Sequence, residues 1–513
     1  MKEIILFFPR PWPGKAMSGR IPYSLLFLYN YLRDTDFKVR IIDERIDNIP
    51  SAIRALGKDI LCFGISSFTG IQIKNGLNIA RQLKAHSPDV PIVWGGWHPS
   101  SLPEQTLQHP LVDIVVRGQG EVTFKELVFA LDKGNDLSGI EGVSYKKNGI
   151  IVHNPDRQLS GVIENIRIPF EAVPVDKYIY KKPFAEQSDR TIGIITSLGC
   201  PYHCGFCAVT GVYKRKVFFR NMDHVLEEID YLANQHKISS ITIDDDNFFV
   251  SPERVMKFSQ ALLGRPYKIS WDAGVSADLL LSKYDDAALD VIKRSGCTQL
   301  YIGAESGSDE ALRMIGKQAT VAHTYEFVKK MKDVGIRASF SSMVGLPVTS
   351  PDEVHQTIDM ILKCREINPD FDYRLFYYTP YPATPLYERA QNMHMKAPAS
   401  LEEWASYTPR RFKAPWLDSS YRRMVKYFCY YYYPYSGEMK HVRHQQIIKR
   451  AAEFIYRMIF ENAILKKIAC VRVKHRYFKF PVDAAFAIQG ARFKSWYDRL
   501  AHQNVDKFAE LDS

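Results

Sequence analysis

The stretch CPYHCGFC, residues 200–207, places three cysteines in one short loop directly after a predicted β-strand. Thiolates at Cys200, Cys204 and Cys207 are spaced so that they can fold around one inorganic cluster. Three ligands on a four-iron cluster leave one iron open to a reactive small molecule, whereas a closed electron-transfer cluster would need a fourth cysteine nearby. A structural zinc ion also needs four ligands. His203 is the candidate for the fourth ligand, but it lies between Cys200 and Cys204 in a very tight loop. The loop therefore favours a [4Fe–4S] cluster with an open iron, and zinc remains the alternative.

The cysteine loop follows the first of six predicted strands that alternate with helical patterns. The strands are expected at residues 191–197, 240–244, 269–273, 299–304, 337–344 and 373–379. Amphipathic stretches fill the gaps between them, for example at residues 252–263. Repeated strand–helix units predict a partial (β/α)6 barrel, similar to a TIM barrel, whose working face is formed by the loops after the strands.

The first 150 residues show a separate alternation of strands and helices. Short apolar runs predict strands at residues 2–8, 39–43, 60–66, 92–95 and 114–117. This alternation predicts an α/β fold with a doubly wound, Rossmann-like parallel sheet, which binds ligands at the carboxyl ends of its strands. Gly-rich loops at residues 66–70, 95–99 and 117–121 would let the backbone approach a large ligand. No G-x-G-x-x-G follows the first strand, which disfavours a dinucleotide, and simple tight turns remain the alternative role for these glycines.

These patterns divide the chain into four parts. They are an N-terminal domain at residues 1–150, a Pro-containing linker at 151–190, the barrel at 191–395, and a basic, aromatic, mainly helical C-terminal region at 396–513.

Composition places the protein among globular chains. Of its 513 residues, 46% are hydrophobic and 24% are charged, a balance that excludes wholesale disorder, collagen and coiled coil. Eight cysteines are too few for a disulfide scaffold, so a reducing compartment is expected. Neither a run of about 18 uncharged apolar residues nor a signal-peptide pattern occurs. We therefore expect a cytoplasmic protein.

The C-terminal region concentrates the basic charge. Residues 410–513 contain 21 Lys or Arg against 9 Asp or Glu, and the whole chain has a net charge of +11. An aromatic run at residues 427–435 precedes a basic, amphipathic helical pattern at residues 441–470. Three roles fit this composition: a helical lid over the barrel, a membrane-surface element that admits a lipid substrate, or a nucleic-acid patch. Nucleic acid is the least favoured partner, and the membrane role predicts peripheral contact with the inner membrane surface.

The spacing C-x-x-x-C-x-x-C after the first strand of a six-repeat barrel resembles the radical S-adenosylmethionine (SAM) superfamily. In that family SAM chelates the open iron, and an electron from the cluster cleaves SAM to a 5′-deoxyadenosyl radical. The resemblance implies these SAM-binding residues: Phe206, Asp244, Asp245, Glu305, Ser306, Gly345 and Pro347. Taken alone, the aspartates could instead cap the helix that starts near Pro252. Glu305 in an otherwise apolar strand is harder to explain structurally, because an unpaired buried carboxylate is costly.

A doubly wound domain in front of such a barrel resembles the cobalamin-binding subgroup of this superfamily. The resemblance implies these cobalamin-binding residues: Ser66, Ser67, Thr69, Gly95, Gly96, His98, Gly118, Gly120 and Glu121. The motif D-x-H-x-x-G, whose histidine coordinates cobalt from below in other cobalamin proteins, does not occur in this sequence. We therefore expect no lower histidine ligand, and we expect His98 to be structural or to contact the nucleotide tail.

Together these resemblances imply a radical SAM enzyme that uses a [4Fe–4S] cluster, SAM and methylcobalamin. The expected reaction is methylation of an unactivated carbon in a hydrophobic or lipid-like small molecule, such as a terpenoid or a tetrapyrrole, with electrons from an external flavodoxin or ferredoxin. A non-methylating cyclase or oxidase is the alternative, and a non-catalytic cobalamin or SAM sensor is a further one. A methylthiotransferase would need three more N-terminal cysteines, and the first 190 residues contain only Cys62.

Overall fold

A computed structural model describes residues 2–11, 20–182, 189–347, 352–408, 412–428, 467–468 and 471–472 of the chain. These residues belong to two compact units. The first unit contains Met1–Arg374 and Tyr378–Trp416, and the second contains Leu375–Tyr377 and Leu417–Ser513. Most of the predicted aromatic run at 427–435 and of the predicted helix at 441–470 lies outside the described residues.

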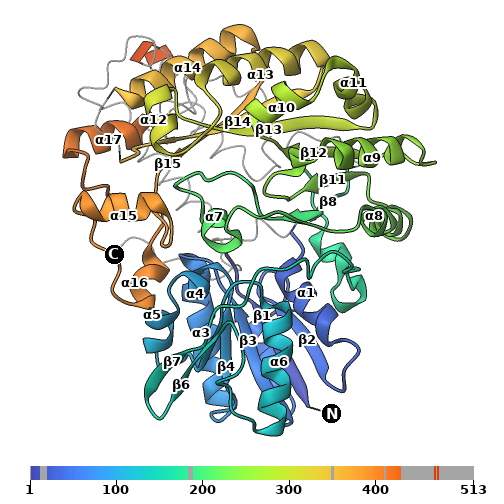
Figure 1. The fold of residues 1–513 in the computed structure, drawn as a ribbon, viewed down its shortest axis with the longest axis vertical. Coiled ribbons are helices and arrows are strands. Elements are labelled where there is room, and N and C mark those ends of the chain that lie inside the picture. Colours follow the sequence, from blue (N-terminus) through green and yellow to red (C-terminus); the bar gives the residue numbers. More distant parts are fainter. Residues whose placement is uncertain are drawn as a thin grey trace, which may run out of the picture. The chain divides into compact units, whose positions relative to one another are not determined.

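The N-terminal part of the first unit is a seven-stranded sheet in the order β2-β1-β3-β4-β5-β6-β7 (Figure 1). Its strands are β1 (Glu3–Phe8), β2 (Lys38–Asp43), β3 (Ile60–Ser66), β4 (Ile92–Gly95), β5 (Ile114–Val116), β6 (Val143–Lys147) and β7 (Ile150–His153). The first five strands pair in parallel, and β6 and β7 add an antiparallel hairpin. This order confirms the predicted doubly wound domain, with the change of direction between β1 and β3.

Helices cover both faces of this sheet, and so the central strands are buried on both sides. They are α1 (Tyr23–Leu32), α2 (Ile49–Arg54), α3 (Ile71–His86), α4 (Trp97–Ser101), α5 (Pro103–Gln108) and α6 (Gly120–Lys133). Every residue of β1 is buried, as expected for a parallel strand between two helical layers. One face packs with α3 and the other with α1 and α6.

The second sheet has the order β15-β14-β13-β12-β11-β8 and confirms the predicted partial barrel. Its strands are β8 (Thr191–Ile194), β11 (Ser240–Ile243), β12 (Ser270–Gly274), β13 (Cys297–Glu305), β14 (Arg337–Val344) and β15 (Asp372–Tyr377). The pairs from β8 to β14 are parallel. The connecting helices include α8 (Met222–His236), α9 (Pro252–Leu263), α11 (Asp286–Arg294), α13 (Val321–Val334) and α14 (Glu353–Ile367).

The first barrel strand is shorter than predicted. β8 ends at Ile194, and the chain continues in a small hairpin of β9 (Ser197–Leu198) and β10 (Phe218–Phe219) that brackets the cysteine loop. Asp245 causes the break, because its carboxylate accepts hydrogen bonds from the N–H and hydroxyl of Thr196. This bending of the strand end gives the cysteine loop a fixed base.

The first compact unit continues to Trp416, beyond the predicted barrel boundary at residue 395. Helices α15 (Pro385–Asn392) and α16 (Leu401–Ser406) follow the last barrel strand. Trp404 of α16 is buried in the same core as Ile73 and Leu77 of α3. In the second unit, α17 spans Ser419–Tyr427. Among the described residues, no helix is both long enough and apolar enough to span a bilayer.

Candidate functional site

The three cysteines of the loop are free thiols held close to one another. Burial raises the pKa of all three, to about 12 for Cys207, and Cys204 further raises the pKa of Cys200 and of Cys207. The loop is fixed by Gly205, whose N–H donates to Ile315 O at 2.7 Å and whose carbonyl accepts from Leu386 N at 2.8 Å. A Cβ at this position would lie 2.6 Å from Leu386 Cδ1, so a larger residue would require that side chain to move.

The donor set fits an iron–sulfur cluster better than a zinc ion. In the described part of the chain, no three His, Cys, Asp or Glu side chains converge as ligands of a single metal ion would. A [4Fe–4S] cluster instead takes each thiolate on a different iron, so its ligands are spread around it. Three neighbouring free thiols in one partly buried loop meet that requirement.

Two charged groups beside the cysteines were missed by the sequence prediction. Asp246 accepts a hydrogen bond from Gly199 N at 2.8 Å and raises the pKa of Cys200 and Cys207. Asp246 is exposed, but the protein around its carboxyl disfavours the charged form and raises its pKa to about 6. Lys317 is the basic group that lowers the pKa of Cys200 and Cys204 against the effect of burial.

The predicted aspartates have different surroundings. Asp245 is saturated, because it accepts hydrogen bonds of 2.6 Å from Thr196 N, Thr196 Oγ1 and Ser197 Oγ. It therefore shapes the base of the cysteine loop. Asp244 forms a 2.9 Å ion pair with Arg20, and burial raises its pKa to about 6.

Glu305 ends β13 in a strained conformation. Its backbone has φ +62°, which is unusual for a residue with a side chain, and the register with β14 shifts at this point. Burial raises the pKa of its carboxyl, and Lys317 Nζ, 3.9 Å away, opposes that rise. The neighbouring Ser306 donates from Oγ to Glu353 of α14 at 2.5 Å, so its side chain is engaged on the helical side.

Phe206, Gly345 and Pro347 lie around one apolar cluster. Phe206 packs against this cluster, which contains the buried Leu346. Trp416 Nε1 donates to Gly345 O at 3.1 Å, and Arg389 Nε donates to Pro347 O at 2.7 Å. The turn that ends β14 is therefore held by two side chains from the segment after the barrel, neither of which was predicted.

The Gly-rich loops of the N-terminal sheet lock together at its carboxyl edge. Ser67 N donates to Gly95 O at 2.9 Å, and His98 N donates to Ser67 O at 3.2 Å. Gly96 has φ +98°, and a Cβ there would lie 2.8 Å from Ser67 O. Gly118 N donates to Ser100 Oγ at 3.0 Å, and nothing lies within 4 Å of its open side. These residues form a backbone cradle, whereas Gly120 faces Leu28 of α1.

His98 is part of the packing beneath this cradle. Its side chain is fully buried, which lowers its pKa to about 3. Nδ1 lies 3.0 Å from Thr69 Oγ1, and the ring packs edge-on against Trp404 at 5.4 Å. Nε2 has no hydrogen-bond partner among the described residues. A ring enclosed in this way is poorly placed to reach a cobalt ion.

At the edge of the cradle lie two stacked aromatic rings, Phe68 and Trp97, and the Glu121 carboxyl, which has one oxygen without a hydrogen-bond partner among the described residues. Phe68 is 43% exposed and stacks on Trp97 at 6.4 Å, which suits the face of a macrocycle. Trp97 in turn packs edge-on against Tyr213 of α7 (Ala208–Tyr213), the helix after the cysteine loop. Glu121 is buried, and its Oε2 has no hydrogen-bond partner among the described residues. This combination fits a large ligand with hydrogen-bond donors, such as a corrin with its amide side chains.

Comparison with known proteins agrees with both halves of this site. The model of the radical SAM superfamily matches residues 194–361, and that of the B12 binding domain matches residues 21–128. A protein of Pyrococcus horikoshii, named an uncharacterized methyltransferase, is 30% identical over 478 residues, which cover 90% of this chain and 99% of that protein. The chain belongs to the cobalamin-binding radical SAM family. It is an enzyme of this family, and its cofactors are a [4Fe–4S] cluster, SAM and cobalamin.

Two further proteins place this cobalamin-binding radical SAM enzyme among its relatives. The anaerobic magnesium-protoporphyrin IX monomethyl ester cyclase of Rubrivivax gelatinosus is 25% identical over 389 residues, covering 73% of this chain and 67% of the cyclase. The structure of the cobalamin-dependent SAM radical enzyme OxsB with aqua-cobalamin bound superposes with a TM-score of 0.71 at 18% identity. It covers 97% of this chain and 76% of OxsB. This likeness shows that the fold is shared.

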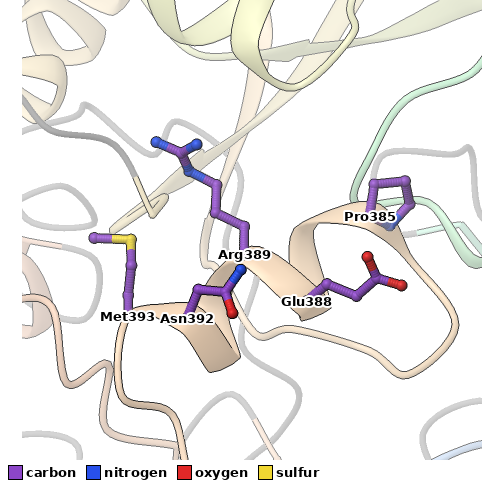
Figure 2. A pocket seen from close by; sticks show the side chains of 5 residues that line it. All are labelled: Pro385, Glu388, Arg389, Asn392 and Met393. Atoms are coloured by element: carbon purple, nitrogen blue, oxygen red, sulfur yellow. The ribbon is translucent and has the colours of Figure 1, made fainter.

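A separate hollow of about 480 Å³ lies along α15 of this enzyme. It is lined by Pro385, Glu388, Arg389, Asn392 and Met393, whose side chains Figure 2 shows spread along the helix. None of the predicted cofactor residues lines it. Its wide opening and mixed lining mark it as a surface depression beside the site.

Proposed function

We propose that this enzyme is a C-methyltransferase that acts on an unactivated carbon of a hydrophobic small molecule. The observation that carries the proposal is the contact between the edge of the cobalamin cradle and α7, the helix that follows the cysteine loop, through the rings of Trp97 and Tyr213 at 6.0 Å. Tyr23 of the N-terminal sheet domain also donates to Gly193 O of β8 at 2.9 Å. When bound, the cofactors supply a hydrogen-abstracting deoxyadenosyl group and a transferable methyl group. The chemistry requires reactive groups to be held near one another and away from water, and these two contacts support such an arrangement.

The protein side chains have separate tasks in this proposal. Cys200, Cys204 and Cys207 hold the cluster, and Lys317 offsets the negative charge that gathers beside it. Phe206 and the turn at Gly345 bound the SAM site from the apolar side. On the cobalamin side, the cradle and Phe68 orient the corrin, with Glu121 accepting a hydrogen bond from it.

A polar network links barrel strands β11 and β12 to the segment before the barrel. Asp272 of β12 pairs with Lys182 and accepts a 3.3 Å hydrogen bond from Thr242 of β11. The Tyr180 hydroxyl lies 2.9 Å from Thr242 Oγ1. These side chains are therefore paired with one another within the protein. Burial raises the pKa of Tyr301, and Asp244 and Asp272 raise it further. We take a carboxylated tetrapyrrole as the first substrate to test, because a magnesium-protoporphyrin IX monomethyl ester cyclase is among the similar proteins.

The test is anaerobic reconstitution with iron, sulfide, cobalamin, SAM and a carboxylated tetrapyrrole, under a strong reductant. Methyl transfer consumes one SAM as radical source and one as methyl donor, so we expect 5′-deoxyadenosine and S-adenosylhomocysteine in a 1:1 ratio with a methylated product. The second candidate function, ring formation or oxidation, is favoured by the similarity to the cyclase. It would give 5′-deoxyadenosine without matching S-adenosylhomocysteine. Cobalamin binding without either product would indicate a sensor.

The electron donor and the place of action in the cell are further parts of the proposal. We expect an external flavodoxin or ferredoxin to reduce the cluster in the cytoplasm. The basic charge of residues 410–513 supports peripheral contact with an anionic membrane surface. In co-sedimentation with anionic vesicles, the full chain should pellet at low salt and be released at high salt, because surface charge attraction is screened. Equal sedimentation of a variant that ends at residue 416 would contradict a role for the basic region.

A further inference from the structure

Four aromatic side chains after the barrel form a continuous row. Trp404, Tyr407, Phe412 and Trp416 are here called the aromatic strap. The centroids of successive rings are 4.9, 5.5 and 5.8 Å apart, which is the range of favourable aromatic pairs. The row packs against the core that Trp404 shares with α3 of the cobalamin domain.

One end of the aromatic strap reaches the cobalamin cradle. The Trp404 ring contacts His98, whose Nδ1 lies 3.0 Å from Thr69 Oγ1. The Tyr407 carbonyl oxygen would lie 3.2 Å from a Cβ at Gly70. Trp404 is also held by a hydrogen bond from its Nε1 to Gln105 Oε1 of α5, at 2.6 Å. The loop that is expected to contact the corrin is therefore packed directly on the strap.

The other end of the aromatic strap reaches the turn at Gly345, which is assigned to SAM. Trp416 Nε1 donates to Gly345 O at 3.1 Å, and the Trp416 ring packs against Tyr378 at 6.3 Å. Tyr378 and the predicted SAM residue Phe206 lie in the same apolar cluster. Both ends of one row of rings thus contact residues assigned to different cofactors.

We propose that the aromatic strap couples the two cofactor sites, so that bound cobalamin strengthens SAM binding and bound SAM strengthens cobalamin binding. A ligand that orders the loop at Thr69 also orders the row of rings, and the turn at Gly345 then loses less entropy when SAM binds. The coupling is reciprocal, because the same free energy links the two sites in either order of binding. The proposal rests on the cofactor assignments of the proposed function and does not depend on methyl transfer.

The experiment measures SAM binding to the full chain with its cluster reconstituted, with and without hydroxocobalamin, by equilibrium dialysis. In the natural protein, cobalamin should lower the Kd for SAM about fivefold or more, the lower limit of typical coupling energies. Phe412→Leu interrupts the row at a residue that is assigned to neither cofactor. In this variant the ratio of the two Kd values should fall to within about twofold of one, while both cofactors still bind.

Two further variants make the result specific. Trp416→Phe keeps a ring but removes the hydrogen bond to Gly345. This variant should lose part of the coupling. It replaces Phe412→Leu in the experiment if that variant does not fold. Phe371→Leu removes a comparable half-buried ring, which lies just before β15 and is stacked on Phe340 at 5.0 Å. It should keep the natural ratio. A ratio of one in the natural protein, or an unchanged ratio in Phe412→Leu, would overturn the coupling. A natural protein that binds no SAM would instead contradict the proposed function.

Discussion

Cys204→Ala should abolish both the brown colour of the reconstituted protein and the formation of 5′-deoxyadenosine. Cys204 is the most buried of the three loop thiols, and it lies next to Gly205, whose backbone ties the loop to Ile315 and Leu386. Two remaining cysteines leave two irons without protein ligands, and no other cysteine belongs to this loop. We expect iron and sulfide content below half of the natural value and no detectable SAM cleavage.

Cys364→Ala is the matched control for this experiment. Cys364 is also a buried free thiol, but it lies on α14 among apolar side chains. Its replacement should cost about 1 kcal/mol of unfolding free energy, as for a small core truncation, and should leave colour and SAM cleavage intact. If Cys204→Ala kept full cleavage, the cluster would have to be held by other residues and the site described above would be wrong.

Lys317→Met should make the cluster harder to reduce. Reduction adds a negative charge, and a nearby cation stabilises the reduced state more strongly where the surroundings exclude water. The Lys317 side chain is largely buried 3.9 Å from Glu305, so its charge is only weakly screened. We expect a more negative midpoint potential in a dithionite titration followed by electron paramagnetic resonance. SAM cleavage should slow about tenfold, the effect of losing one charge-assisted contact of about 1.4 kcal/mol.

Two controls separate this electrostatic effect from a structural one. Lys317→Arg keeps the positive charge and should restore most of the natural potential. Lys329→Met removes an exposed lysine that pairs with Asp333 on α13 and should change neither potential nor rate. A Lys317→Met protein with a lower melting temperature but an unchanged potential would show that Lys317 serves only to neutralise Glu305.

The sequence predicted the elements of this fold well because their patterns are local. All five parallel strands of the first sheet and all six barrel strands are present near the expected residues. The main difference is the end of β8, where Asp245 binds Thr196 from 49 positions away. Strand length was limited there by a side chain from another strand end, which hydrophobic alternation cannot reveal.

The candidate site was predictable only where a motif lies within one loop. The cysteine loop is such a case, whereas Lys317 and Trp416 reach the site from segments that carry no motif of their own. Lys317 approaches the cysteines because Ile315, two residues earlier, accepts the hydrogen bond from Gly205. Asp246 had a weak signal as the third of three consecutive aspartates, and the resemblance directed attention to the first two.

The shared core around Trp404 has a consequence for the order in which the nascent chain can mature. The apolar face formed by Ile73 and Leu77 is completed by Tyr387, Leu401 and Trp404, which leave the ribosome some three hundred residues later. Domains made first usually fold first during translation, but this one must wait, half covered, until the barrel has been synthesised. Folding of the cobalamin-binding domain therefore depends on synthesis of the barrel and the segment after it. A prematurely terminated chain would expose this apolar face to chaperones and proteases.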